Sequence, residues 1–272
     1  MSDIKEPFLV YPGSKWKLAP WIISHFPKHI SYLEPFAGSI AVFLQKEKSP
    51  IEVLNDLDGD IVNLLRVIRD QTEDLLFSLE LTPWSREEFE LSYDRSNVSS
   101  VEQARRFVVN CWQSYGVKRA HSTGWKIDTK CNARKYYASS WKRIPERILA
   151  IVDRLRDAQI ENRPAIEIIP RFKSDKVLIY ADPPYMSSTR SRGLYKFEMN
   201  NMEHEILIKE LLDHPGPVVL SGLHHPLYDH LLLSWKRVEQ NSVIRSGASN
   251  TEVLWINPIA IMKLEDQCTI TS

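Results

Sequence analysis

Residues 181–185, Ala-Asp-Pro-Pro-Tyr, combine side chains that suit the recognition of an aromatic amine. The carboxylate of Asp182 can accept hydrogen bonds from an amino group. A backbone carbonyl next to a proline meets no competing amide donor at that proline, because proline lacks an N–H. The ring of Tyr185 can stack on a flat ring. On these letters alone, a clamp for a planar amine and a plain turn that ends a strand are equally good interpretations.

The element before this motif decides where it lies. Residues 176–180 are mostly apolar and β-branched, which is typical of a buried strand. In open α/β sheets, ligands bind at the carboxyl ends of the strands. We therefore expect Asp182 to stand at a ligand-binding edge.

Two glycine turns upstream are suited to an anionic or nucleotide-like ligand. Residues 11–15 carry Gly13 and Lys15 just ahead of a predicted helix at 17–25. Such a turn can bring backbone N–H groups close to an anion, although a plain entry loop is the better interpretation of this stretch alone. A second turn, 35–39, joins a predicted strand at 30–34 to a helix at 40–46, the unit that lets a nucleotide approach the backbone.

An acid follows the next predicted strand, 51–54, at Asp56. A carboxylate about twenty residues after the glycine turn can accept hydrogen bonds from a ribose diol. The alternative is that Asp56 or Asp58 caps the helix predicted at 59–70, and both interpretations hold if the two acids divide these tasks.

The composition is that of an ordinary globular protein and excludes several classes. The 272 residues are 43% hydrophobic and 26% charged, with 35 basic and 35 acidic side chains. No stretch approaches the roughly 18–20 apolar residues of a membrane span. The first residues lack the pattern of a signal peptide, so we expect a cytoplasmic protein. The three cysteines, Cys111, Cys131 and Cys268, have neither metal-ligand spacing nor an even disulfide framework, and we expect no metal.

The alternating strand and helix pattern of the sequence stops at about residue 71 and resumes at 158. Residues 85–88 and 99–102 each predict a capping box that opens a helix, and residues 141–156 predict another helix. Positions 101–150 hold eleven basic and three acidic residues, a net charge of +8. Such a local charge is the footprint expected for binding a polyanion, and the alternative is a solvated basic loop. We expect 71–157 to be a mostly helical insertion.

The rest of the chain completes an alternating pattern. Strands are predicted at 158–162, 217–222, 235–244 and 252–256, with helices ending at 172 and spanning 202–213. This order predicts a parallel-rich, doubly wound sheet in an α/β fold.

Taken in order, these motifs resemble the Dam-type DNA adenine methyltransferases, the alpha-ordered group. The resemblance rests on Tyr11-x-Gly13-x-Lys15, on residues 34–39, on Asn55-Asp56, on the basic insertion and on residues 182–185. It implies a Rossmann-like sheet of seven strands, S-adenosylmethionine as methyl donor, residues 1–70 and 158–272 as the catalytic domain, and residues 71–157 as the target-recognition domain.

The resemblance also implies roles for individual residues. The predicted cofactor-binding residues are Tyr11, Lys15, Glu34, Phe36, Gly38, Asp56 and Asp182. The predicted catalytic residues are Asp182, Pro183, Pro184 and Tyr185. Two positions depart from the family pattern. Ile40 stands where a second glycine is common, and Pro164 or Ala165 stands where many members have an acid.

The implied reaction is direct methyl transfer to the N6 amine of an adenine that is flipped out of double-stranded DNA. Asp182 and the Pro183 carbonyl would accept the two amine hydrogens, and Tyr185 would stack on the base. The residues predicted to contact DNA are Asn110, Gln113, Lys118, Arg119, Lys126 and Arg134. Asparagine and glutamine suit adenine, and arginine suits guanine.

Other functions stay open at this point. The cytosine N4 amine and RNA are alternative substrates, and a catalytically inactive DNA-binding relative is an alternative of another class. The recognition sequence, the oligomeric state and the presence of a restriction endonuclease counterpart are not readable from these residues.

Overall fold

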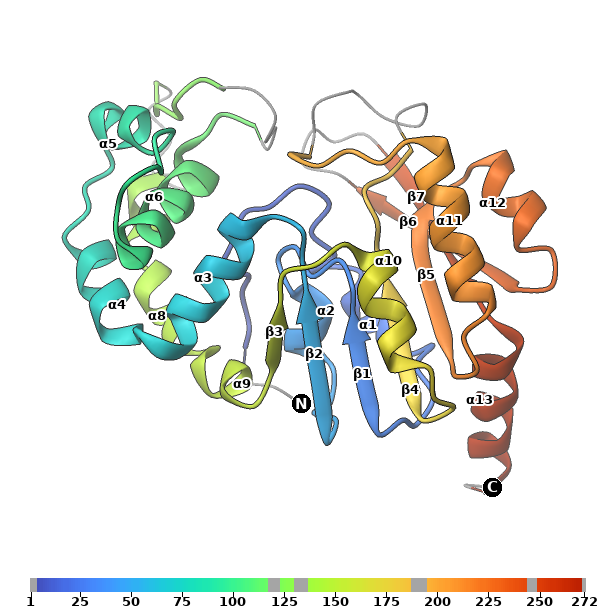
Figure 1. The fold of residues 1–272 in the computed structure, drawn as a ribbon. Coiled ribbons are helices and arrows are strands. Elements are labelled where there is room, and N and C mark those ends of the chain that lie inside the picture. Colours follow the sequence, from blue (N-terminus) through green and yellow to red (C-terminus); the bar gives the residue numbers. More distant parts are fainter. Residues whose placement is uncertain (1–3, 117–122, 130–136, 187–194, 244–248, 271–272) are drawn as a thin grey trace.

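The computed structural model describes residues 4–116, 123–129, 137–186, 195–243 and 249–270. In these residues seven strands form one sheet in the order β3-β2-β1-β4-β5-β7-β6. The strands are β1 (Ser31–Glu34), β2 (Ile51–Asn55), β3 (Gln159–Glu161), β4 (Val177–Ala181), β5 (Val218–Leu223), β6 (Lys236–Val243) and β7 (Ser249–Ile256). All neighbours run parallel except β7, which is antiparallel to both β5 and β6 (Figure 1).

The strands divide their apolar side chains between the two faces of the sheet. In β4, Leu178 and Tyr180 join one buried cluster, whereas Val177, Ile179 and Ala181 join the other. This alternation is the period of two that a strand imposes. Because both faces are buried, the sequence of β4 has the continuous apolar run that predicted it.

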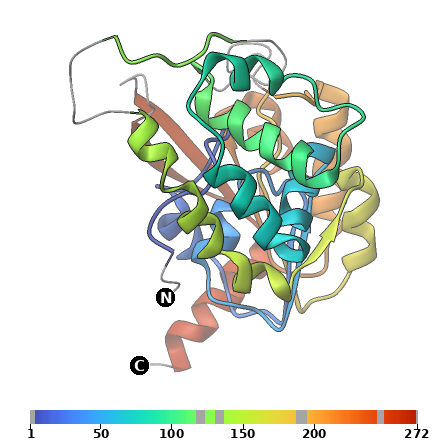
Figure 2. The same ribbon diagram turned by 90° about the vertical axis from the view of Figure 1, so that its left-hand side faces the viewer.

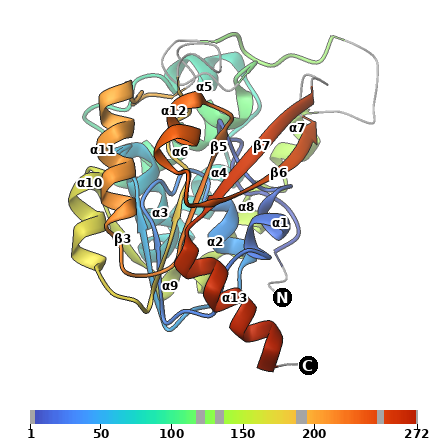
Figure 3. The ribbon, with the colours of Figure 1, turned by 90° about the vertical axis from the view of Figure 1, so that its right-hand side faces the viewer.

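Helices cover both faces. The first cluster contains residues of α1 (Ala19–Ile23), α2 (Ala41–Gln45) and α3 (Gly59–Asp70), and the second contains residues of α10 (Ala165–Ile168), the 3₁₀ helix η2 (Ile169–Phe172), α11 (Asn201–Leu212) and α12 (Pro226–Leu231). Figure 3 shows the sheet between these two helical layers, with α13 (Pro258–Ile270) leading away from the body at the end of the chain.

The predicted helical insertion lies between α3 and β3. Its described helices are α4 (Thr72–Glu80), α5 (Arg86–Leu91), α6 (Ser100–Gln113), α7 (Tyr137–Trp141), α8 (Ile144–Leu149) and α9 (Val152–Arg156). They form a group beside the sheet in which α6 packs on α3 (Figures 1 and 2).

The caps of α5 and α6 show how these helices start. Ser85 and Ser99 accept hydrogen bonds from the backbone N–H groups of Glu88 and Glu102, as the capping boxes predict. Both glutamates, however, direct their carboxylates to Arg105, which thereby joins the two helices. The first half of each box is confirmed, and contacts with Arg105, one between helices and one within α6, replace the second half.

Most of the predicted elements are confirmed, including the seven strands. The helix predicted at 141–156 is wrong in detail, because the chain forms α7, α8 and α9 in succession. Pro145 lies in the first turn of α8, where its missing N–H costs nothing, and it thus marks the start of a new helix. The helices α4, α12 and α13 were not predicted. No helix in the described part of the chain is both long enough and apolar enough to cross a membrane.

Candidate active site

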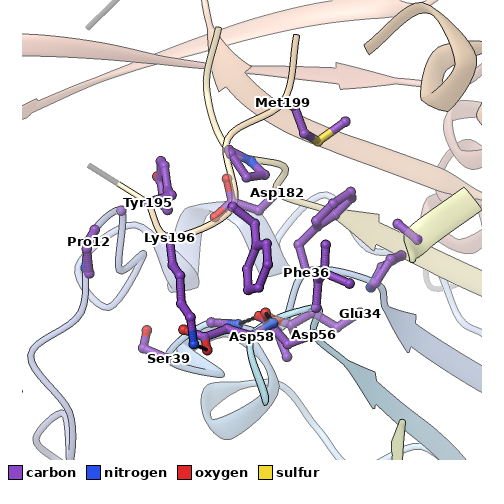
Figure 4. Close-up of a pocket in the computed structure, with 18 of the residues that line it drawn as sticks. Pro12, Glu34, Phe36, Ser39, Asp56, Asp58, Asp182, Tyr195, Lys196 and Met199 are labelled. Atoms are coloured by element: carbon purple, nitrogen blue, oxygen red, sulfur yellow. Dashed lines mark hydrogen bonds and ion pairs between the residues drawn. The ribbon is translucent and has the colours of Figure 1, made fainter. Parts of the chain in front are cut away.

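A pocket opens at the carboxyl ends of β1, β2 and β4, beside the point where the strand order reverses. The stretches that line it include 11–15, 34–39, 56–58, 163–166, 180–184 and 195–199 (Figure 4). The residues that the resemblance assigned to the methyl donor all line it: Tyr11, Lys15, Glu34, Phe36, Gly38, Asp56 and Asp182. Pro184 also lines the pocket, whereas Pro183 is buried.

The two predicted glycine turns meet in this pocket. Gly13 and Gly38 have φ angles of 70° and 47°, a region that only glycine enters without strain. A Cβ atom on Gly38 would lie 3.5 Å from the ring of Tyr11. The ring of Tyr11 therefore lies close to the second turn, and the turn presents bare backbone to the pocket.

Ile40 takes the conformation that a second glycine would have. Its φ and ψ are 49° and 28°, and its side chain is fully buried at the start of α2. A left-handed conformation costs a residue with a Cβ roughly 1–2 kcal/mol. The chain thus keeps the backbone geometry expected at this position and adds a packed side chain.

Asp56 organises the region between β1 and β2. Its Oδ2 accepts the Gly38 N–H at 2.8 Å, and its Oδ1 accepts the Asp58 N–H at 2.8 Å. Burial raises the pKa of Asp56 to about 6, although these two backbone donors oppose the rise. Each carboxylate oxygen accepts more than one hydrogen bond, so Asp56 can hold the glycine turn and still receive a hydroxyl donor.

Asp58, the alternative helix cap, serves in that role. Its side chain accepts the Asp60 N–H at the start of α3. Both acids line the pocket, and of the two Asp58 caps the helix, whereas Asp56 holds the glycine turn at Gly38.

Asp182 forms a buried ion pair with Lys15 at the centre of the site. Lys15 Nζ donates to both of its carboxylate oxygens at 2.8 Å, and Lys15 is only 5% exposed. Burial raises the pKa of Asp182 to about 6. Lys15 opposes the rise, and the nearby carboxylate of Glu252 adds to it. Although burial alone would lower the pKa of Lys15, the charges of Asp182 and Glu252 raise it above its usual value.

Tyr185 is fixed by the same charges. Its hydroxyl accepts a hydrogen bond from Lys15 Nζ at 2.5 Å and donates to the carboxylate of Glu252, whose two oxygens lie at 2.9 Å. The Lys15 ammonium lies 4.7 Å from the centre of the tyrosine ring. Ser221 also donates to Glu252, at 2.5 Å. The aromatic ring predicted to stack on a base is therefore held at its outer end.

Glu34 is a second acid at the floor of the pocket. Burial raises its pKa to about 8, with Asp182 adding to the rise and the Tyr32 hydroxyl, which donates at 2.7 Å, opposing it. A carboxyl group in this state is protonated at neutral pH and can donate a hydrogen bond.

The segment 195–199 crosses the pocket and is anchored on its far side. Lys196 Nζ contacts Asp58 Oδ1 at 3.1 Å and Asp60 Oδ2 at 3.2 Å. Figure 4 shows Lys196 reaching from this segment, beside Tyr195, toward Asp58. Asp60 also receives Arg95 at 3.2 Å from the insertion. The segment 195–199, through Lys196, and the insertion, through Arg95, thus contact the same carboxylate, that of Asp60.

Two residues predicted to read bases lie inside the insertion. Asn110 is 7% exposed and donates to Ser92, whereas Gln113 is fully buried and bonds the Pro83 carbonyl and the Trp125 indole. Their burial argues against direct base contacts, because neither amide reaches the surface. The helical spacing that placed them on α6 did not show which face of the helix packs inward.

The basic character of the insertion is also partly internal. Arg105 and Arg106 pair with Glu102, and Arg147 pairs with Glu6. Lys126, which was predicted to contact DNA, donates to the Trp112 carbonyl at 2.7 Å. The other predicted contacts, Lys118, Arg119 and Arg134, lie outside the described residues.

Several residues of this site were not predicted. Glu252 directly precedes the apolar part of β7, and an acid at such a position was the one available signal. Tyr195 ends a Ser/Arg-rich stretch, 186–195, whose composition suits a loop near a substrate, but no local signal marks Lys196. After β3, residues 163–166 line the pocket without an acid, in agreement with the departure noted at Pro164 and Ala165.

Comparisons with known proteins bear on this arrangement. The family model of D12 class N6 adenine-specific DNA methyltransferases matches residues 11–244 of the chain. A type II methyltransferase of Lactococcus lactis subsp. cremoris is 26% identical over 267 residues, which cover 90% of this chain and 91% of that protein. A DNA adenine methylase of Salmonella typhi is 24% identical over 229 residues, which cover 79% of this chain and 80% of that protein.

Shorter and weaker similarities were also found. A DNA adenine methylase of Escherichia coli K12 is 33% identical over 67 residues, 25% of this chain and 24% of that protein. Among solved structures, a putative RNA methyltransferase of Pyrococcus horikoshii aligns over 94% of this chain and 89% of that chain, with 7% identity and a TM-score of 0.38.

Proposed function

The chain belongs to the D12 class N6 adenine-specific DNA methyltransferases, and we propose that the pocket at the carboxyl edge of its sheet is the site of methyl transfer. The observation that carries this proposal is the convergence of Asp182 and Asp56 on one pocket. Asp56 follows β2 and Asp182 follows β4, the two strands on either side of β1, and the glycine turn after β1 lies between them. One acid suits the acceptor base and the other suits the methyl donor.

The residues present fit S-adenosylmethionine. Asp56 offers a carboxylate to a ribose diol, and the turn at Gly38 has no Cβ to block the methionine part. Phe36, Pro164 and Ile166 give apolar surface for a purine ring. When bound, S-adenosylmethionine supplies an electrophilic methyl group on a cationic sulfur.

The protein acts on the adenine by positioning it. The exocyclic amine is a weak nucleophile because its lone pair is delocalised into the ring. Asp182 and the Pro183 carbonyl accept its two hydrogens, which favours a lone pair directed out of the base plane toward the methyl group. Positive charge passes from sulfur to nitrogen without net change, so orientation in a site closed to water supplies much of the rate. The chain's own Asp182 then takes up the proton released by the methylated amine.

Tyr185 supplies the platform for the base. Double-stranded DNA hides the N6 amine inside the helix, so the adenine is flipped into the pocket. Stacking of a base on an aromatic ring is worth about 1–3 kcal/mol. Since Lys15 and Glu252 hold the Tyr185 hydroxyl, little further ordering of the ring is needed when the base arrives.

The same arrangement supports a division into two domains. We assign catalysis to residues 1–70 and 158–272, and DNA contact to the basic insertion 71–157. Lys118, Arg119 and Arg134 are the proposed contacts in it, since Asn110 and Gln113 are buried. A restriction endonuclease counterpart is proposed from the similarity to a type II methyltransferase.

Nucleoside analysis tests the proposal. The protein is incubated with methyl-labelled S-adenosylmethionine and mixed-sequence double-stranded DNA, and the DNA is digested to nucleosides. We expect label in N6-methyl-2′-deoxyadenosine alone. Label in N4-methyl-2′-deoxycytidine, label only when RNA replaces DNA, or no label would contradict the proposal.

A further inference from the structure

A buried acid on the antiparallel strand completes the charge balance around Asp182. Because β7 runs against its neighbours, its early residues lie at the same edge as the carboxyl ends of the parallel strands. Glu252 pairs with Leu223, the last residue of β5, and is 3% exposed. An ionisable side chain in this setting requires partners.

The partners of Glu252 all belong to the proposed transfer site or adjoin it. Tyr185 and Ser221 donate hydrogen bonds to its carboxylate, and Lys15 Nζ lies 3.5 Å from Oε1. The same ammonium binds both oxygens of Asp182. Lys15 is therefore placed between two carboxylates and is shared unequally by them.

This sharing matters because Asp182 has to receive an amine. With Asp182 alone, the Lys15 ammonium would neutralise the carboxylate that the adenine needs. The group formed by Lys15, Asp182 and Glu252 carries a net charge of −1 when both acids are ionised. That charge favours a base whose amine becomes cationic as the methyl group is transferred.

We propose that Glu252 is a positioning residue for methyl transfer. It fixes the hydroxyl of Tyr185 and takes a share of the Lys15 ammonium, so that Lys15 neutralises the ionised Asp182 less completely and the carboxylate can accept from the adenine amine. This inference rests on the proposed function, since it assumes that Asp182 receives the base.

The substitution Glu252→Gln isolates the charge, because glutamine has the same size and keeps one acceptor oxygen. We expect the single-turnover rate of methyl transfer to fall about tenfold to a hundredfold, since each tenfold step reflects about 1.4 kcal/mol of lost transition-state stabilisation. The affinity for S-adenosylmethionine, measured by equilibrium titration, should stay within about twofold, because Glu252 does not line the pocket.

A pH profile separates positioning from a purely structural role. Glu252 raises the pKa of Asp182, so its neutralisation should move the acid limb of the rate profile to lower pH. The ionisable side chains that act on Asp182 or are acted on by it come from four elements and two loops: Lys15, Glu34, Tyr180, Tyr185, Tyr228 and Glu252. Among them, Glu252 alone changes in this variant.

Glu52→Gln is the matched control. Glu52 is also 3% exposed and paired with a lysine and an arginine, but it lies near the amino end of β2, at the opposite edge of the sheet. We expect it to lower the melting temperature and to leave the acid limb in place. Glu252→Asp keeps the charge and moves it back by one methylene, so its rate should lie between those of the wild type and Glu252→Gln.

The outcomes distinguish this inference from the proposed function. A Glu252→Gln rate within twofold of the wild type, an unmoved acid limb, or an equal loss in Glu52→Gln would overturn the role of Glu252 alone. If Glu252→Gln does not fold, a Glu252→Asp rate equal to that of the wild type would overturn it. A wild-type protein that makes no N6-methyladenine would instead overturn the proposed function.

Discussion

At the scale of single residues, the site depends on charges that are buried and mutually compensated. Asp182 has a pKa of about 6 because burial outweighs the opposing effect of Lys15. Glu34, in the same pocket, has a pKa of about 8. Two acids in one pocket thus differ in protonation near neutral pH, one ionised as a hydrogen-bond acceptor and the other protonated as a donor.

The state of Asp182 predicts a pH dependence. The acceptor form is the ionised one, and it is lost as pH falls through the pKa of about 6. The single-turnover rate should therefore be nearly constant above about pH 7 and fall toward tenfold per pH unit below about pH 5.5. Rate measurements in overlapping buffers, with folding checked by circular dichroism, test this. A rate that stays constant down to about pH 4.5 would exclude Asp182 as the titrating acceptor.

Ile40 predicts a stability difference that depends on backbone conformation. Ile40→Gly removes a buried side chain but relieves the left-handed strain, whereas Ile68→Gly removes an equally buried side chain from inside α3. The helix interior also pays about 1 kcal/mol for glycine. We expect Ile68→Gly to lose about 2 kcal/mol more unfolding free energy than Ile40→Gly. Equal losses in urea denaturation would show that Ile40 is not strained.

At the scale of elements, the sequence predicted the helices, strands and turns that have a clear local pattern. The buried run of β4 and the glycine turn after β1 are visible because each has its own period or composition. The helices α12 and α13 escaped prediction, since six residues and a weakly amphipathic stretch give little periodic signal. Glu252 and Lys196 could not be assigned because their partners lie 31 to 237 positions away in the chain. The strand order that brings these partners together cannot be read from the sequence.

The segment 195–199 lines the pocket, and we predict that its ion pairs to Asp58 and Asp60 increase the affinity for S-adenosylmethionine. Lys196→Met removes the ion pairs to Asp58 and Asp60 and keeps the length of the side chain. We expect the Kd for S-adenosylmethionine to rise about tenfold, which corresponds to a loss of about 1.4 kcal/mol of binding free energy when the segment is no longer held over the pocket. Lys209→Met, at an exposed position of α11, is the control and should leave the Kd unchanged. An unchanged Kd in Lys196→Met would contradict the role of this anchor.

At the scale of the whole molecule, we expect that destabilising the insertion impairs DNA binding and leaves cofactor binding at the catalytic sheet intact. The guanidinium of Arg105 joins α5, α6 and the end of α4 through Glu88, Glu102 and Thr82. Its removal should destabilise the insertion by about 2 kcal/mol, the range of charged hydrogen bonds that are partly exposed.

Arg105→Met should therefore weaken DNA binding more than cofactor binding. We expect the DNA Kd to rise at least about fivefold and the Kd for S-adenosylmethionine to change less than about twofold, because Arg105 is not among the residues that line the pocket. Arg66→Met, at an exposed position of α3, is the control. Equal loss of both affinities would contradict the assignment of DNA contact to residues 71–157.

The account as a whole depends on Asp182 as the acceptor of the adenine amine, and its most direct test is a single-turnover measurement. Wild type, Asp182→Ala and Asp175→Ala are compared with methyl-labelled S-adenosylmethionine and DNA, with enzyme in excess. Asp175 is an exposed acid just before the other end of β4.

We predict that Asp182→Ala transfers methyl groups at least about a thousandfold more slowly while its DNA affinity is retained, and that Asp175→Ala matches the wild type. An Asp182→Ala protein that methylates adenine within about tenfold of the wild-type rate would contradict the central claim.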